Sequence, residues 1–175
     1  MRKPSTPGGR GFTLVEIAVA TAIVGIALAA LLAAVGSNTR INDAGAKLTQ
    51  GVFLAQEIRE WTLTLPFSDR DSGDADNPPG PDGTSPQVFV DDLDDFYGTD
   101  GLGTTYNPPR NGRGTAIPEL AGWSQTITLT WRDPNDIATP VTAGTSDLIS
   151  VQVGVAYQGK SVTGASWLVA RKEQP

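Results

Sequence analysis

The chain has 175 residues, a formal net charge of -6, and neither cysteine nor histidine. This length fits one domain plus an anchor rather than two full domains, and the missing cysteine excludes disulfides. The missing histidine removes the commonest general base and the usual zinc ligand. The sequence also contains no nucleophile elbow, Ser-x-x-Lys motif or phosphate loop, so it predicts a protein that is not an enzyme and has no cofactor.

Residues 1–11 are predicted to be a removable basic leader. They carry Arg2, Lys3 and Arg10 among prolines and glycines, without an apolar stripe. Under the positive-inside rule these charges keep the N-terminus in the cytoplasm, so that everything after Val35 faces the periplasm or the exterior. Loss of the three basic residues would change the formal charge from -6 to -9, which disfavours a nucleic-acid partner bound through its phosphates.

Residues 12–35 are predicted to form a transmembrane helix. Ile17 to Val35 is a run of 19 residues without a charge. At about 1.5 Å per residue this run makes a helix of roughly 28 Å, close to the ~30 Å hydrocarbon core of a bilayer. Glu16 lies where the helix enters the lipid, and carrying a carboxylate to the bilayer centre costs roughly 2.5 to 3.5 kcal/mol. A simple anchor would not carry this residue, so Glu16 is predicted to be functional.

The junction between leader and helix reads GFTLVE over residues 11–16. A short basic leader that ends in glycine, followed by this hexapeptide and a long apolar run, resembles the processing signature of type IV prepilins and of the pseudopilins of type II secretion systems. The resemblance covers roughly residues 1–67. It implies that a membrane-embedded prepilin peptidase cuts between Gly11 and Phe12, that the new amino group of Phe12 is N-methylated, and that Glu16 meets this ammonium group in the packed filament.

The pairing that the resemblance implies has a physical reason. In an apolar bundle the Phe12 ammonium group and the Glu16 carboxylate are each costly alone, and leaving one of them unpaired costs about 3 to 5 kcal/mol. The pair would therefore fix the register between neighbouring helices. Two alternatives stay open: Glu16 lies at the headgroup interface of an ordinary anchor, or Ile17 to Val35 is the apolar region of a secretory signal peptide that is cut before Ser37.

Residues 36–66 are predicted to form an amphipathic helix in series with the first one, because apolar residues recur mostly at steps of three or four. These positions are Ile41, Ala44, Leu48, Val52, Ala55, Ile58 and Leu65. Gly36, Gly45 and Gly51 each weaken a helix by roughly 1 kcal/mol relative to alanine, so bends are expected there. Pro66 should end the helix, because a residue before proline is pushed out of the α region.

Residues 67–122 are predicted to be a loop-rich acidic region. The alternating carboxylates of Asp69 to Asp76 suggest a Ca²⁺ site, since this cation takes 6 to 8 oxygen ligands. The spacing lacks the final glutamate of an EF-hand loop, so a solvated acidic loop is the alternative, and no metal ligand is assigned. Residues 88–90 resemble a short strand. In the acidic-aromatic segment that follows, Leu93 and Phe96 are expected to lie under the domain while the neighbouring aspartates stay in solvent.

Residues 123–175 are predicted to form an antiparallel β-sheet, because the apolar period changes to two. The alternating residues are Trp123, Ile127, Leu129 and Trp131 in the first strand and Ile149, Val151, Val153, Val155 and Tyr157 in the second. After a turn at residues 158–161, residues 162–170 return as a third strand. Trp123, Trp131 and Trp167 are expected in the core. A sheet with one apolar face needs a cover, which the amphipathic helix supplies.

The predicted fold is therefore α+β and pilin-like: a long N-terminal helix, with a membrane half and an amphipathic half, packed on a small antiparallel C-terminal sheet. The predicted function is that of a structural subunit, a minor pilin or pseudopilin, because the chain lacks the disulfide-closed C-terminal loop of many major pilins. The expected partners are prepilin peptidase, other pilin or pseudopilin subunits and the inner membrane, which the chain spans once with its C-terminal domain outside. The alternative is a membrane-anchored or secreted extracytoplasmic module that binds Ca²⁺ or another ligand.

Overall fold

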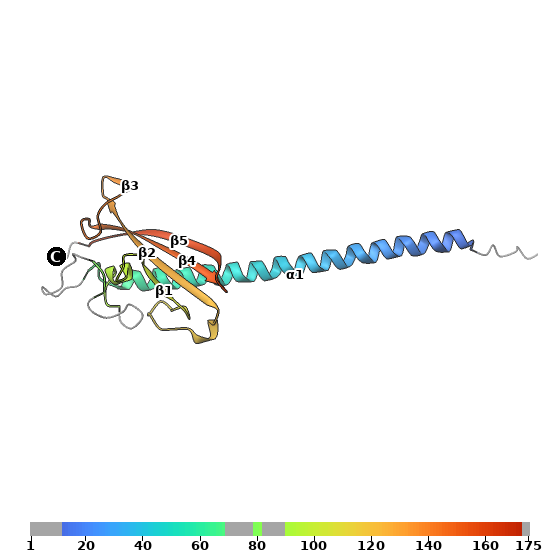
Figure 1. Ribbon diagram of the computed structural model, residues 1–175, viewed down its shortest axis with the longest axis horizontal. Helices are drawn as coiled ribbons and strands as arrows, with labels where there is room; N and C mark the ends of the chain where they lie inside the picture. Colours follow the sequence, from blue (N-terminus) through green and yellow to red (C-terminus); the bar gives the residue numbers. More distant parts are fainter. Residues whose placement is uncertain (1–11, 69–78, 82–89, 173–175) are drawn as a thin grey trace, which may run out of the picture. The chain divides into compact units, whose positions relative to one another are not determined.

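A computed structural model describes residues 12–68, 79–81 and 90–172. Figure 1 shows a long N-terminal helix and a C-terminal antiparallel sheet, which confirms the predicted α+β class. The elements are α1 (Leu14–Thr64), η1 (Asp94–Tyr97), β1 (Thr104–Tyr106), η2 (Pro118–Leu120), β2 (Trp123–Asp133), β3 (Asp136–Pro140), β4 (Leu148–Tyr157) and β5 (Lys160–Ala170). The chain divides into two compact units, Met1–Gly45 and Ala46–Pro175.

Helix α1 contains 51 residues and is unbroken. It ends at Thr64, two residues before Pro66, as the restriction on residues that precede proline predicts. The expected bends at Gly36 and Gly45 do not interrupt it. A β-carbon added at either glycine would meet no atom within 4 Å, so neither residue is required there by packing.

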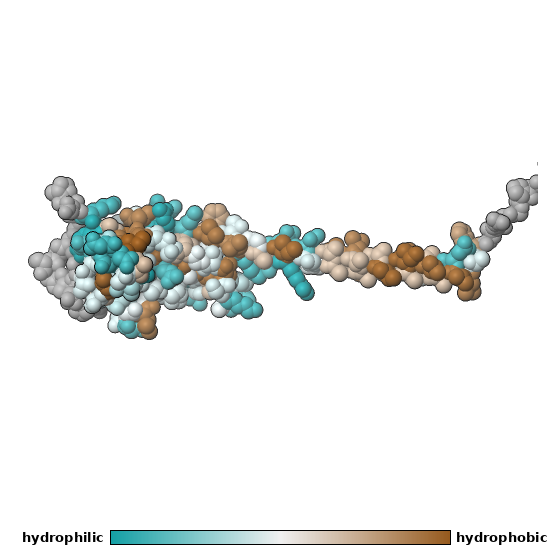
Figure 2. Space-filling view, turned by 90° about the horizontal axis from the view of Figure 1, so that it is seen from above, coloured by the Kyte–Doolittle hydropathy of each residue, from teal (hydrophilic) through white to brown (hydrophobic). Residues whose placement is uncertain are grey.

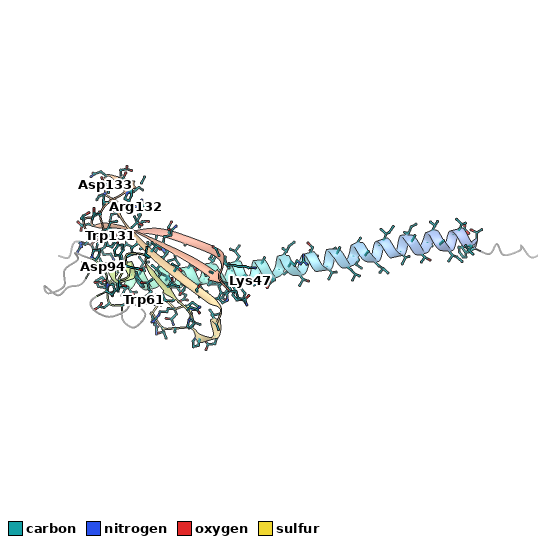
Figure 3. All side chains as sticks on the ribbon, in the orientation of Figure 1. Lys47, Trp61, Asp94, Trp131, Arg132 and Asp133 are labelled. Carbon is teal, nitrogen blue, oxygen red and sulfur yellow. The ribbon has the colours of Figure 1, made fainter. Side chains whose placement is uncertain are left out.

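The sheet lies in the unit Ala46–Pro175 and has the strand order β1-β2-β4-β5, with β3 paired to the end of β2. All of these pairs are antiparallel. Strands β2, β4 and β5 are the three that the period of two predicts. Strand β1 was not predicted, and neither was β3, which forms a hairpin with β2 that carries Arg132 and Asp133 (Figure 3). The guanidinium Nη1 of Arg132 donates to the Ala138 carbonyl across this hairpin, at 3.1 Å.

The core lies between the C-terminal part of α1 and one face of the sheet. The buried apolar residues of α1 are Leu54, Ala55, Ile58 and Trp61, and those of β2 and β4 are Trp123, Ile127, Leu129, Trp131, Ile149, Val151, Val153 and Val155. Trp123 and Trp131 are therefore core residues, as predicted, whereas Trp167 is only half-buried. Each fully buried aliphatic side chain contributes about 1.5 to 3 kcal/mol relative to an exposed one.

The face of α1 that packs on the sheet differs from the predicted one. Ile41, Leu48 and Val52, which the apolar period placed on the buried face, are 64%, 50% and 43% exposed. Leu54 and Trp61 are buried instead, together with Ala55 and Ile58 of the predicted set. The helix thus has a buried face and a second, exposed apolar stripe. The apolar period in the sequence does not distinguish these two faces.

Gly51 of α1 lies directly against side chains of β5. A β-carbon at this position would lie 2.9 Å from Thr163 Cγ2 and 3.1 Å from Val162 Cγ1. Because real β-carbons do not come this close to other atoms, the glycine is what allows the strand to lie against the helix. Gly51, unlike Gly36 and Gly45, therefore has a packing reason.

The prediction for the acidic-aromatic segment was half right. Leu93 and Phe96 are fully buried, as expected, but Asp92, Asp94 and Asp95 are buried as well. Asp94 and Asp95 begin the 3-10 helix η1, which also contains Phe96. A turn this tight cannot place Leu93 and Phe96 in the core without drawing in the residues between and beside them.

A buried glutamine ties the loop before β2 to helix α1. Gln125, fully buried on the core face of β2, donates through Nε2 to the carbonyls of Leu54 at 2.8 Å and Arg110 at 3.0 Å. Its Oε1 accepts the Arg110 backbone N–H at 2.7 Å. The amide thereby satisfies its donors and its acceptor inside the core, where an unpaired polar group would be costly.

Strand β5 forms one edge of the sheet. It pairs with β4 along its length, and no other described strand lies beyond it. After Lys160 at its first position, residues 161–170 of β5 contain no charged residue and no proline, two devices that protect an edge strand. By contrast, β1 has three residues and is followed by Pro108 and Pro109, and β3 contains Asp136 and Pro140.

Candidate functional site

The candidate site is the start of helix α1. Gly11, the predicted residue before the cleavage point, lies outside the described residues. Phe12 and Thr13 precede the helix, whose first residue is Leu14. Phe12 is 84% exposed, and Glu16 lies in the first helical turn. Two of the three predicted site residues, Phe12 and Glu16, are therefore brought within one turn of each other.

Thr13 and Glu16 form a reciprocal capping box. The Thr13 backbone N–H donates to Glu16 Oε2 at 2.8 Å, and the Thr13 hydroxyl donates to the same oxygen at 3.1 Å. The Glu16 backbone N–H in turn donates to Thr13 Oγ1 at 3.3 Å. Each side chain thus satisfies a backbone donor that the first turn of a helix leaves without an intrahelical partner.

The capping box fixes where the Glu16 carboxylate points. Helical side chains lean toward the N-terminus, and the three hydrogen bonds hold this carboxylate over Thr13, next to Phe12. The partial positive charge at a helix N-terminus stabilises a carboxylate there, typically by about 0.3 to 1 kcal/mol. The negative charge is therefore presented at the end of the helix and not along its side.

The rest of this part of α1 suits an apolar environment. It is the one helix of the described residues that is long and apolar enough to cross a membrane. The hydroxyl of Thr21 donates to the Ile17 carbonyl at 2.8 Å, so this polar group is satisfied within the helix, as a lipid environment requires. Figure 2 shows apolar residues covering the surface of the helix near its start.

Apolar side chains are exposed around the whole circumference of this segment. The large exposed ones between residues 14 and 35 are Leu14, Val15, Ile17, Val19, Ile23, Val24, Ile26, Leu28, Leu31, Leu32 and Val35. A helix that is apolar all round is normally surrounded by lipid or by other helices. Glu16 is the one charged residue in this segment.

Sequence reasoning missed Thr13 as a site residue. Its signal was present, because Thr13-Leu14-Val15-Glu16 has the Thr-x-x-Glu spacing of a capping box directly before an apolar run. The carboxylate of Glu16 is unusual in an apolar run, whereas a threonine three residues earlier is not conspicuous by itself.

The second candidate site is the acidic loop that the sequence suggests for Ca²⁺. The whole Asp69–Asp76 segment, expected to be a possible Ca²⁺ site, lies outside the described residues. Val88 and Phe89 of the short strand expected before the acidic turn also lie outside them, and Val90 is not in a strand. Across residues 12–68, 79–81 and 90–172, no group of three or more acidic, histidine or cysteine side chains is placed to hold a metal ion.

Comparison with known proteins bears on the first site alone. Residues 8–32 match the prokaryotic N-terminal methylation motif, which is the signature of type IV prepilins and pseudopilins. The match includes Gly11, Phe12, Thr13 and Glu16. No curated protein and no solved structure matches the chain.

Proposed function

We propose that this chain, whose residues 8–32 carry the signature of type IV prepilins and pseudopilins, is a structural subunit of a type IV pilus or a type II secretion pseudopilus. Prepilin peptidase cuts it between Gly11 and Phe12, and the new amino group of Phe12 is methylated. The mature subunit then joins a filament through the apolar start of α1. Proteins with this signature are structural rather than catalytic.

The observation that carries the proposal is the position of Glu16. Its carboxylate is held at the start of an apolar helix, next to the residue that would become the N-terminus. A carboxylate in apolar surroundings needs a positive partner, and cleavage after Gly11 creates one at Phe12. Within one chain the capping box occupies Glu16 Oε2, so the ammonium group of a neighbouring copy is the partner we infer.

The expected location follows from the same segment. The precursor lies in the cytoplasmic membrane with its basic leader inside, and α1 crosses the bilayer once. The domain that contains the sheet lies in the periplasm or outside the cell. Its partners are prepilin peptidase and other pilin or pseudopilin subunits. A minor pilin or pseudopilin fits best, because the chain has no cysteine to close the C-terminal loop of many major pilins.

Intact mass and N-terminal sequencing of the native protein test the proposal. We expect a chain that begins at Phe12 and carries an added methyl group. A chain that begins at Ser37 would show a secreted protein, and one that begins at Met1 would show a plain anchor; either result would contradict the proposal. In a matched control, Gly11→Val adds bulk at the residue before the cut, and this variant should retain Met1 or the residue after it.

A further inference from the structure

The acidic turn, residues 91–97, buries more carboxyl groups than any other described segment. Asp92, Asp94 and Asp95 are 3%, 7% and 3% exposed, and Asp91 is exposed beside them. Removing an ionised carboxylate from water costs several kcal/mol unless a positive charge or good hydrogen bonds compensate for it. Three such groups within four residues need an explanation.

The carboxyl groups cannot leave the core without the apolar residues between them. Leu93 and Phe96 are fully buried, and the Leu93 N–H donates to the Pro66 carbonyl at 3.0 Å. The Phe96 ring packs edge-to-face on Trp61 with ring centres 5.0 Å apart. In Figure 3, Asp94 is labelled on η1 and Trp61 on α1. Packing of Phe96 in the core therefore requires burial of the neighbouring aspartates.

Backbone amides of the described residues donate to these carboxyl groups. Asp92 Oδ1 accepts the N–H groups of Asp94 at 3.0 Å and Asp95 at 3.2 Å. Asp95 Oδ2 accepts the Asp91 N–H at 3.0 Å, and Asp94 Oδ2 accepts the Gly80 N–H at 3.3 Å. These bonds support a charge only partly, and each carboxylate also repels its neighbours along the turn.

The described side chains that pack against the turn include several uncharged aromatic rings. Trp61 of α1 and Trp131 of β2, which lies 5.1 Å from Tyr97, are uncharged. Tyr106 of β1 faces Phe96, with ring centres 6.4 Å apart, and burial raises the pKa of its phenol, so it stays neutral. The Arg110 guanidinium lies 4.6 Å from the centre of the Tyr106 ring, opposes the rise in the pKa of the Tyr106 phenol, and donates to the Gly114 carbonyl.

We propose that the acidic turn is a pH-dependent switch. When Asp92 and Asp95 are protonated, the turn holds Leu93 and Phe96 in the core; as they ionise with rising pH, residues 90–98 detach from it. The charge that accumulates, and not a ligand, opens the segment. This inference concerns the sheet-bearing unit alone and does not depend on the proposed assembly into a filament.

The electrostatics of the turn support this assignment. Burial, together with a hydrogen bond to Asp94 and the charge of Asp94, raises the pKa of Asp92 to about 8, against the lowering effect of the Asp95 backbone N–H. Burial likewise raises the pKa of Asp95 to about 6, with the charge of Asp92 acting in the same direction. Because the folded-state pKa values lie above the ordinary value, the stability is present at low pH and is lost as the pH rises through them.

The magnitude follows from proton linkage. Once the turn opens, Asp92 returns to an ordinary pKa of about 3.9, so between pH 6 and pH 8 opening releases one proton. The opening equilibrium constant should therefore rise about tenfold per pH unit over that range and level off above pH 8. Between pH 4 and pH 6 the rise is steeper, because Asp95 also titrates.

Hydrogen exchange of the full chain in detergent micelles tests the switch. Exchange at the backbone amides of residues 90–98, corrected for the intrinsic pH dependence of amide exchange, should speed up about 100-fold from pH 6 to pH 8. Asp92→Asn keeps the Oδ1 acceptor and cannot ionise, so its protection should not change over this range. The matched control is Asp100→Asn, an exposed aspartate whose Oδ1 accepts the Leu102 N–H at 3.0 Å; it should follow the wild type.

Several results would overturn the inference. Wild-type protection that is constant or increases from pH 6 to pH 8 contradicts it, whatever the variants do. An Asp92→Asn chain that loses protection as steeply as the wild type also contradicts it. If Asp92→Asn does not fold, the pH dependence of Asp95→Asn decides: it should keep the tenfold slope above pH 6 and lose the steeper part below, and an unchanged profile rejects the switch.

Discussion

At position 16 a single carboxylate has two partners in turn under the proposed function. In the isolated chain Thr13 holds it through two hydrogen bonds, and these bonds also start the helix. In a filament the Phe12 ammonium group of a neighbour would add a positive charge beside it. Under the proposed function, the capping box would hold the carboxylate in place before its final partner arrives.

Two substitutions at this residue separate charge from capping. Glu16→Val removes both, and Glu16→Gln keeps the capping hydrogen bonds while it loses the charge. We expect both variants to enter the membrane, since each lowers the cost of insertion. Neither should reach the filament, because the Phe12 ammonium group is left buried without a partner, at about 3 to 5 kcal/mol.

The measurement is the amount of subunit in sheared surface fractions relative to the membrane fraction. Assembly of Glu16→Gln at wild-type levels, with Glu16→Val absent, would assign the role to capping alone. Wild-type levels of both would reject the pairing.

Gln125 is the buried polar residue on which the loop before β2 depends. Gln125→Leu fits the space but leaves the Arg110 N–H and the Arg110 carbonyl without the partner that Gln125 supplies. We expect a loss of about 1 to 3 kcal/mol in the free energy of unfolding, the cost of burying unsatisfied groups. Denaturant unfolding followed by tryptophan fluorescence measures it.

The control is Gln152→Leu on β4, where the side chain is exposed. The free energy of unfolding of this variant should lie within about 0.5 kcal/mol of the wild-type value. Equal losses in the two variants would mean that the Gln125 hydrogen bonds add nothing specific.

At the scale of the element, α1 shows what an apolar period can and cannot predict. Its existence and its end before Pro66 follow from local rules. Its buried face does not, because Leu48 and Val52 fit a three-and-four spacing as well as Leu54 and Ile58 do. Only the position of the sheet decides between such stripes, and that position depends on contacts remote in sequence.

The glycines of α1 provide a test of this packing. Gly51→Ala should destabilise the sheet-bearing unit by about 1 kcal/mol or more, because the overpacking against Thr163 and Val162 outweighs the gain in helix propensity. Gly45→Ala, where the new β-carbon meets no atom within 4 Å, should be neutral or stabilising by up to about 1 kcal/mol. Thermal unfolding of the two variants in the same detergent compares them, and a stabilised Gly51→Ala chain would contradict the close approach.

Among the strands, local pattern was sufficient where the strand is long and half-buried. Strands β2, β4 and β5 each have ten or eleven residues, and β2 and β4 alternate clearly between buried and exposed positions. Strand β1 has three residues, and every residue of β3 is exposed, so neither carries a period of two that the sequence could reveal. The residues of β1 and β3 alone do not predict that these strands pair with β2.

At the scale of the whole molecule, the two units depend on different surroundings. The described residues of Met1–Gly45 have exposed side chains throughout, whereas Ala46–Pro175 contains the entire buried apolar core. All four tryptophans, Trp61, Trp123, Trp131 and Trp167, belong to the second unit. The tryptophan bands of the near-ultraviolet circular dichroism spectrum therefore report on that unit.

This division predicts a two-step loss of structure. In detergent micelles, urea should abolish the near-ultraviolet signal in one cooperative transition while a helical far-ultraviolet signal persists, because the micelle and not the core supports Leu14–Gly45. More than half of α1 lies in that range. If both signals disappear together at one midpoint, the helix depends on the sheet along its whole length and the division is wrong.

Phe12 and Glu16 stay predictions of the sequence. Glu16 is predicted because a charge in a long apolar run is conspicuous, Phe12 because residues 11–16 resemble the prepilin signature, and Thr13 follows from the capping-box rule. The burial of Asp92, Asp94 and Asp95 was beyond local rules, because aspartates are usually exposed and only the seating of Leu93 and Phe96 draws them inward. Tertiary contacts override residue preference at that turn.

Strand β5 has a practical consequence for anyone who purifies the protein. An uncharged ten-residue stretch at a sheet edge is a template on which further copies can stack, with strands about 4.7 Å apart, into amyloid-like fibres. At high protein concentration, aggregation should therefore begin through residues 161–170. Ser166 is exposed, and the substitution Ser166→Lys would place a charge on this edge strand and reduce aggregation in storage.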